Sequence, residues 1–142
     1  PPNHRLMAPA AKPGREAGSY DLMMVIVDET DEAAMAKWHD YHDNADMDAL
    51  AWMAGQSAGD PNADASGTAA SITAPEGAVN FNMGTIVGSY ESVAQMLDEA
   101  ATVPGTKGIM LTFDDFVQGI EDFGTKIQPL MKSRAGEGAT TQ

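Results

Sequence analysis

GIMLTFDDFVQGIEDFGTKIQPLM, residues 108–131, is the stretch of sequence that decides the fold. The apolar run at 109–111 has no polar alternation, a pattern typical of a strand covered on both faces, as in a parallel sheet. Asp115 is placed to cap the amides of a following helix, with Gln118 reaching back in a capping-box arrangement. The stretch therefore predicts a strand over 108–113, a turn and a helix, which together form one βα unit.

The helix of this unit is expected to carry one apolar stripe at helical spacing, made of Phe116, Ile120, Phe123, Ile127 and Leu130. In βα units, ligands usually bind at the carboxyl end of the strand. Thr112 and Asp114 are therefore candidate binding residues. Asp115, beside them, is already explained by its role as a cap.

A second near-continuous apolar run, at 20–27, predicts another buried parallel strand. A helix is expected from about 31 to 44, with Thr30 as its cap, and a second helix from Asp46 to a stop at Gly55. The segment 78–87 has partial alternation and predicts a short extended piece, after which residues 88–89 open a further helix. The predicted fold is α/β with two parallel strands.

The rest of the chain divides by composition. Residues 1–19 are rich in proline and glycine and are expected to form an irregular lead-in. Residues 56–77 are rich in small and polar types and predict a flexible insertion, a surface loop or a lid above a binding site. Residues 135–142 are expected to form a disordered tail. Two strands are a small part of any stable α/β sheet, so we expect the chain to be incomplete.

The composition narrows the class of protein. The 142 residues have 43% hydrophobic content, which suits one packed domain, and a formal net charge of −13. Such a charge argues against nucleic acids and anionic membranes as partners, since both are bound by clustered Lys and Arg. The chain has no cysteine, which rules out disulfides and thiolate metal sites. Without an apolar run of about 18 residues, we expect a cytoplasmic protein with no membrane partner.

Few residues predict chemistry on their own. His39, His42 and Asp43 lie close together on one predicted helix, but their spacing favours a solvated face over a zinc site, so we assign no metal ligand. Asn80 and Asn82 are candidates for hydrogen bonding to a heterocycle, although asparagine is commoner in turns. No Ser-His-Asp or Cys-His set is readable. We therefore assign no catalytic residue.

Five runs of sequence resemble a known family: 28–38, 82–90, 97–106, 111–116 and 127–131. Together they are similar to the carboxy-terminal part of the pyrimidine monooxygenases of the Rut uracil-degradation pathway. These are luciferase-like, FMN-dependent oxygenases, and the resemblance covers residues 20–134. It implies the C-terminal part of a (β/α)8 TIM barrel, with the seventh strand at 20–27 and the eighth at 108–113.

The same resemblance implies an activity. Reduced FMN, supplied by a separate NADH-dependent flavin reductase, and O2 would be used to open the ring of a uracil- or thymine-like substrate. The family's main flavin and substrate contacts belong to earlier strands, so no cofactor-binding residue is assigned. The chain alone is expected to be inactive.

Two alternatives remain open at this point. One is another luciferase-like FMN monooxygenase with a different small-molecule substrate. The other is a non-catalytic αβ interaction module that pairs through open strand edges. Homo-oligomerisation also remains open.

Overall fold

The computed structural model describes residues 18–58 and 84–135. The chain forms two compact units, one made of residues 1–35 and 84–142 and the other of residues 36–83. Most of the predicted lead-in, insertion and tail lies outside the described residues, as do Asn80 and Asn82. Where described, the margins of these segments are ordered elements: Ser19 begins a strand, and residues 56–58 belong to a helix.

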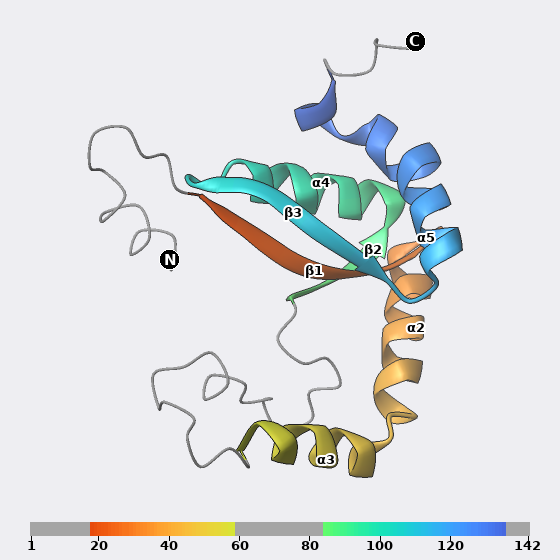
Figure 1. The fold of residues 1–142 in the computed structure, drawn as a ribbon. Helices are drawn as coiled ribbons and strands as arrows, with labels where there is room; N and C mark the ends of the chain where they lie inside the picture. Colours follow the sequence, from red (N-terminus) through yellow and green to blue (C-terminus); the bar gives the residue numbers. More distant parts are fainter. Residues whose placement is uncertain (1–17, 59–83, 136–142) are drawn as a thin grey trace, which may run out of the picture. The chain divides into compact units, whose positions relative to one another are not determined.

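The first unit is built on a parallel sheet, as the sequence predicted (Figure 1). Strand β1 (Ser19–Asp28) pairs with β3 (Thr106–Phe113), so that Val25 lies opposite Phe113. A third strand, β2 (Gly84–Ser89), pairs in parallel with the other side of β1. The order across the sheet is β2-β1-β3.

The prediction of two strands is therefore wrong. The segment that was expected to be extended, 78–87, forms strand β2 in its described part, residues 84–87. The strand then continues through residues 88–89, where a helix was expected to begin. Because β2 lies between β1 and β3 in the sequence, these two cannot be the consecutive seventh and eighth strands. β1 is the longest strand and contains the buried run 25–27. Its central position in the sheet provides hydrogen-bonding partners on both of its sides.

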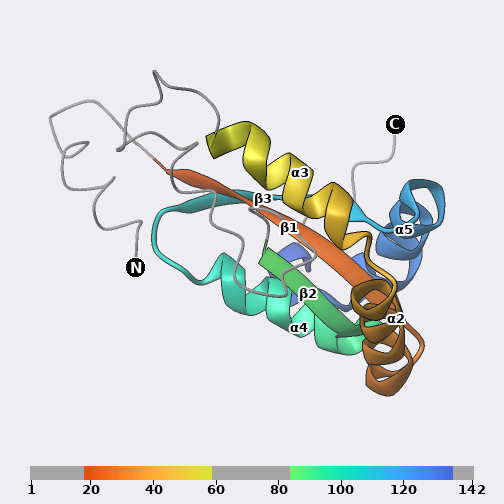
Figure 2. The same cartoon turned by 90° about the horizontal axis from the view of Figure 1, so that it is seen from below.

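One face of the sheet is covered by helices (Figures 1 and 2). Helix α4 (Tyr90–Ala101) begins at Ser89, whose hydroxyl accepts a hydrogen bond from the Ser92 amide at 3.2 Å. Its buried side includes Val93 and Leu97, which pack with strand and C-terminal residues into one core. The core members are Val25, Val27, Ile86, Val93, Ala94, Leu97, Phe113, Ile127 and Met131.

The other face of the sheet carries exposed apolar side chains. Tyr20 is 74% exposed and Met110 is 59% exposed. Met110 belongs to the run at 109–111, which was predicted to be covered on both faces, and that prediction is wrong at this residue. Successive side chains of each strand point to opposite faces of the sheet. The helices that follow β2 and β3 pack only on the face that contains the core.

The C-terminal helical segment departs from a simple helix. Helix α5 (Phe116–Asp122) passes into a π-helical stretch (Phe123–Ile127) and then into two 3-10 turns (Gln128–Leu130 and Lys132–Arg134). The π stretch has more residues per turn, so it rotates the later residues out of the phase set by α5. Only part of the predicted stripe is therefore buried: Ile127 is inside, while Phe116 and Ile120 are 59% and 63% exposed.

Gly119 is buried where helix α5 passes close to Phe113 of strand β3. A Cβ at this position would overlap the side chain of Phe113 at the end of β3. A glycine therefore allows the close approach of α5 to the strand that precedes it. The turn into β3 uses a second glycine, Gly105, at a φ of 91° that favours this residue type.

Two further helices were predicted near their observed bounds. Helix α2 (Asp31–Asp43) is capped by Thr30, whose hydroxyl accepts from the Ala33 amide at 3.2 Å, which confirms the predicted cap. Helix α3 (Met47–Ala58) follows Asp46, but it continues past Gly55, so the predicted stop there is wrong. Gly55 does not adopt the positive φ of a C-terminal glycine cap. None of the described helices is both long enough and apolar enough to cross a membrane.

Candidate functional site

The three parallel strands end at the same edge of the sheet, here called the carboxyl edge, which comprises the strand ends at Asp28, Ser89 and Phe113 and the residues just after them. Thr112 is half-buried there and Asp114 is exposed, as expected of residues at a strand end. The Asp114 carboxylate accepts from the Asp115 amide at 3.0 Å.

Asp115 caps helix α5 as predicted. Its carboxylate accepts from the amides of Val117 and Gln118 at 2.9 and 3.0 Å. The predicted capping box is wrong in its second half, because the side chain of Gln118 donates to Asp122 instead, at 2.9 Å. Asp122 is buried and needs donors, whereas the Asp115 amide is already bonded to Asp114.

Asp31 joins two strand ends at this edge. Its carboxylate accepts from the Ser89 amide at 2.6 Å and from the Ser92 hydroxyl at 3.1 Å. The amide of Ser89, followed by the hydroxyl of Ser92, holds the pKa of Asp31 below its ordinary value. The first residue of α2 is thus anchored as an anion to the start of α4, which fixes the turn after β1 against the end of β2.

A second network lies where α4 begins. Lys126 donates to the Tyr90 hydroxyl at 2.9 Å and pairs with Asp122 at 3.0 Å, and its ammonium lies 4.6 Å from the centre of the Tyr90 ring. Burial raises the pKa of Asp122, but hydrogen bonds from Lys126 and Gln118 outweigh it and leave that pKa below its ordinary value. Hydrogen bonds to Tyr90 and Asp122 raise the pKa of Lys126, so it stays an ammonium and cannot serve as a general base.

The histidines of α2 belong to the second unit. The ring of Trp38 lies edge-on to His39 at 5.1 Å and stacks on His42 at 5.5 Å, and His42 contacts the Asp43 carboxylate at 3.3 Å. Over the described parts of the chain, 18–58 and 84–135, no three His, Cys, Asp or Glu side chains are grouped to hold a metal ion.

The structure thus places Thr112 and Asp114 at the carboxyl edge, and it adds residues that sequence reasoning missed: Asp31, Tyr90, Asp122 and Lys126. One signal was readable. Asp122 and Lys126 have the i, i+4 spacing of a helical ion pair, and the aspartate interrupts an apolar stretch. Ser89 and Tyr90 are distant in sequence from the residues that they contact, Asp31 and the Asp122–Lys126 pair. No local pattern could therefore predict these contacts.

Similar proteins come from several bacteria. The chain is 64% identical over 134 residues to a protein from Caulobacter vibrioides named pyrimidine monooxygenase RutA, 65% identical over 133 residues to one from a Bradyrhizobium strain, and 55% identical over 138 residues to one from an Enterobacter strain. These matches cover 94 to 97% of the chain but only 37 to 38% of each relative. No model of a known protein family matches the chain.

Proposed function

This chain belongs to the family of proteins named pyrimidine monooxygenase RutA, and we propose from that premise that it contributes to an enzyme that opens the ring of a uracil-like pyrimidine. The observation that carries the proposal is 64% identity over 134 residues, since this extent includes the carboxyl edge as well as the core. The enzyme would use reduced FMN and O2, with a separate NADH-dependent reductase supplying the flavin in the cytoplasm.

The described residues do not by themselves fit the phosphate of FMN. The carboxyl edge carries the carboxylates of Asp28, Asp31, Asp114 and Asp115, and Lys126, which contacts Tyr90 at the start of α4, is already bound to Asp122. At the start of α4, the Ser92 amide is occupied by Ser89, and Asp31 adds a negative charge beside it. A phosphate would be repelled here. We therefore assign flavin contacts to parts of the family fold outside the described residues.

The part that we assign to this chain is structural. The Asp31 and Asp122 networks hold the loops after the strands in fixed positions, which is the requirement for placing a substrate beside a cofactor. A (β/α)8 barrel of the luciferase-like type belongs to this proposal, and the parallel pairing of β1 with β2 and β3 supports it. The observed order β2-β1-β3 differs from such a barrel, in which strand neighbours follow sequence order and β2 would lie between β1 and β3.

A chimera tests the function. The 134 matched residues of the Caulobacter vibrioides relative are replaced by those of this chain, and uracil consumption is followed with reduced FMN and O2. We expect the chimera to consume uracil and the isolated chain to bind no FMN in a flavin fluorescence titration. A folded chimera without activity on uracil would contradict the proposed substrate and favour another luciferase-like monooxygenase.

One observation supports the alternative function, a non-catalytic αβ module that associates with another protein. β2 and β3 form the two outer strands of the described sheet, and each has only β1 as a neighbour. Saturable association of the isolated chain with a second protein, combined with an inactive chimera, would favour this function over the enzymatic one.

A further inference from the structure

Helix α5 carries a row of large apolar side chains that the core does not cover. Phe116, Val117 and Ile120 are each more than half exposed. Ile120 lies four positions after Phe116 and three after Val117, so the three side chains are neighbours on one face of the helix. They are here called the α5 stripe. A contiguous apolar surface of this kind marks an interaction site, whereas apolar residues exposed singly need no explanation.

The other side of α5 is held by contacts within the first unit. With about 100° between successive residues of a helix, Gln118 and Asp122 lie opposite the stripe. Asp122 is buried there and accepts from Gln118 at 2.9 Å and from Tyr90 of α4 at 3.4 Å. Gly119, between the two sides, packs so close to Phe113 that a Cβ would overlap it. These contacts fix the rotation of α5, so the stripe faces away from α4.

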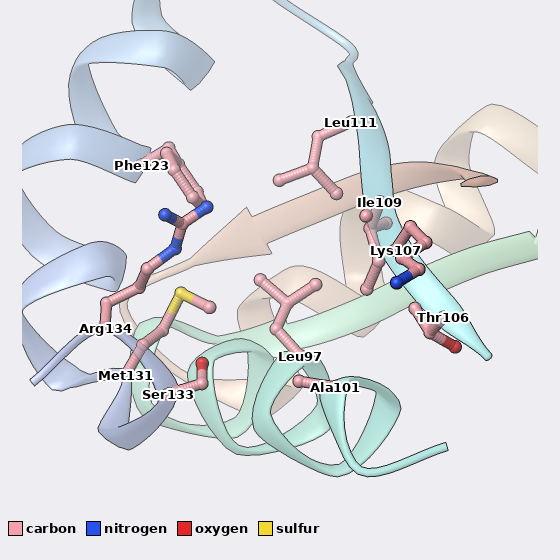
Figure 3. A pocket seen from close by; sticks show the side chains of 11 residues that line it. Leu97, Ala101, Thr106, Lys107, Ile109, Leu111, Phe123, Met131, Ser133 and Arg134 are labelled. Atoms are coloured by element: carbon pink, nitrogen blue, oxygen red, sulfur yellow. The ribbon is translucent and has the colours of Figure 1, made fainter. Parts of the chain in front are cut away.

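The residues that follow α5 also face inward. Figure 3 shows Phe123 and Met131 pointing from the C-terminal helical segment into a cavity of about 320 Å³, which Leu97 of α4 and Leu111 of β3 line as well. Ile127, between them in sequence, is completely buried in the core. The segment thus covers β3 with its inner face and leaves the stripe as its apolar outer surface.

The strand before α5 is the last one on its side of the sheet. β3 has β1 as its only neighbour among the strands that residues 18–58 and 84–135 form. An outer strand is a template on which a further strand can add, and in β3 the run 109–111 is the apolar part of that template. Only residues 114–115 connect β3 to α5. The outer side of β3 and the α5 stripe therefore form one continuous surface, on the side away from β1 and α4.

We propose that this surface binds a βα unit from the part of the family's longer chain that these residues do not span, with its strand parallel to β3 and its helix against the α5 stripe. The matches cover only 37 to 38% of each relative, so each relative has a further part more than one and a half times as long as the matched one. A βα unit supplies both a strand and a helix with an apolar face.

A second copy of this chain fits the surface less well. A two-fold axis would pair β3 with β3 in antiparallel orientation, whereas all the pairing in the described sheet is parallel. The proposal rests on the family assignment and does not depend on the activity proposed above.

Co-expression tests the proposal. The full chain is produced together with a second polypeptide, made of the residues of the Caulobacter vibrioides relative that lie outside the 134 matched ones, and the product is sized by light scattering. We expect a one-to-one complex in which hydrogen exchange at residues 109–111 and 117–120 is slower than in the chain alone. No complex, or a complex without this protection, would overturn the proposal. A dimer of the chain alone that protects these residues would also overturn it, in favour of a second copy.

Substitutions separate the interface from general stability. Ile120→Glu places a charge in the proposed interface and should weaken the complex about tenfold or more, while the unfolding of the chain alone stays unchanged because Ile120 is exposed there. Val103→Glu adds the same charge at an exposed position after α4, outside the surface, and should change neither. Equal weakening of the complex by both substitutions would overturn the proposal.

The covalent chimera provides a second measurement, which does not require two polypeptides to assemble. Its Tm should fall with Ile120→Glu and stay unchanged with Val103→Glu. A chimera that consumes uracil and whose Tm does not respond to Ile120→Glu would contradict this interface and leave the proposed function in place. An assembled complex without activity on uracil would contradict the proposed function and leave the interface in place.

Discussion

The two ends of the sheet differ in the charge of the side chains beside them. At the carboxyl edge, carboxylates predominate and the chain's own donors bind them: Asp31 is held by Ser89 and Ser92, and Asp122 by Gln118 and Lys126. At the opposite edge, where strand β3 begins, Lys107 and Arg134 are among the residues that line a cavity, and no Asp or Glu lines it. Polar groups at the first edge therefore fix the shape of the fold. Exposed polarity at a strand end is not, by itself, a binding site.

The largest effect should come from breaking the buried network near the carboxyl edge. Asp122 is 8% exposed and accepts from both Gln118 and Lys126, so Asp122→Ala leaves two donors without their acceptor. We expect the free energy of unfolding, measured with urea, to fall by about 2 kcal/mol. The Lys126 side chain is 44% exposed, so water screens part of the pair and the loss stays below that of a fully buried ion pair.

Glu121→Ala is the matched control for this change. It removes a carboxylate of the same charge from the neighbouring position, where the side chain is exposed. Its unfolding free energy should stay within about 0.5 kcal/mol of the wild-type value. If both variants lose the same stability, charge alone matters and the network does not fix the carboxyl edge.

An intermediate, local effect is expected where α4 holds the C-terminal turn. The Asp98 carboxylate accepts from the Ser133 hydroxyl at 2.7 Å and from the amides of Ser133 and Lys132 at 3.0 and 2.8 Å. The Ser133 bonds hold the pKa of Asp98 below its ordinary value of 3.8. The contact therefore contributes stability above that value and loses it as the pH falls through the lower folded-state pKa.

Hydrogen exchange at Lys132 and Ser133 measures this contact. Protection of both amides should fall as the pH drops below 3.8, and Asp98→Asn should reduce it already at neutral pH. Glu99→Gln removes the same charge from the next position on α4 and should leave these two amides protected. Unchanged protection in Asp98→Asn would show that the C-terminal turn at 132–134 does not depend on this carboxylate.

The smallest effect concerns the buried hydroxyl of Thr106, the first residue of β3, which has no hydrogen-bond partner among the described atoms. Thr106→Val replaces a buried group that makes no hydrogen bond with an apolar group of the same shape. We expect the urea unfolding free energy to rise by up to about 1 kcal/mol. Thr102→Val should have the opposite sign, because the Thr102 hydroxyl donates to the Glu99 carbonyl at 2.7 Å. A loss of stability in Thr106→Val would mean that an ordered water satisfies the hydroxyl.

Local sequence was sufficient for much of the fold. The apolar runs at 20–27 and 109–111 predicted β1 and β3 and their parallel arrangement, and the caps at Thr30 and Asp115 predicted where two helices begin. Each of these features depends on residues within a few positions of one another, so spacing alone encodes it. The family, too, was readable from runs of sequence.

Tertiary structure decided what depends on distant residues. The strand order β2-β1-β3 depends on pairing between segments that are distant in sequence, and Gly119 and Ile127 are buried while Phe116 and Ile120 are exposed. The cavity at the start of β3 likewise joins residues from β3, α4 and the C-terminal helical segment, which are separate in sequence. Periodicity shows which residues can share a face, but only packing against other elements determines which face is buried.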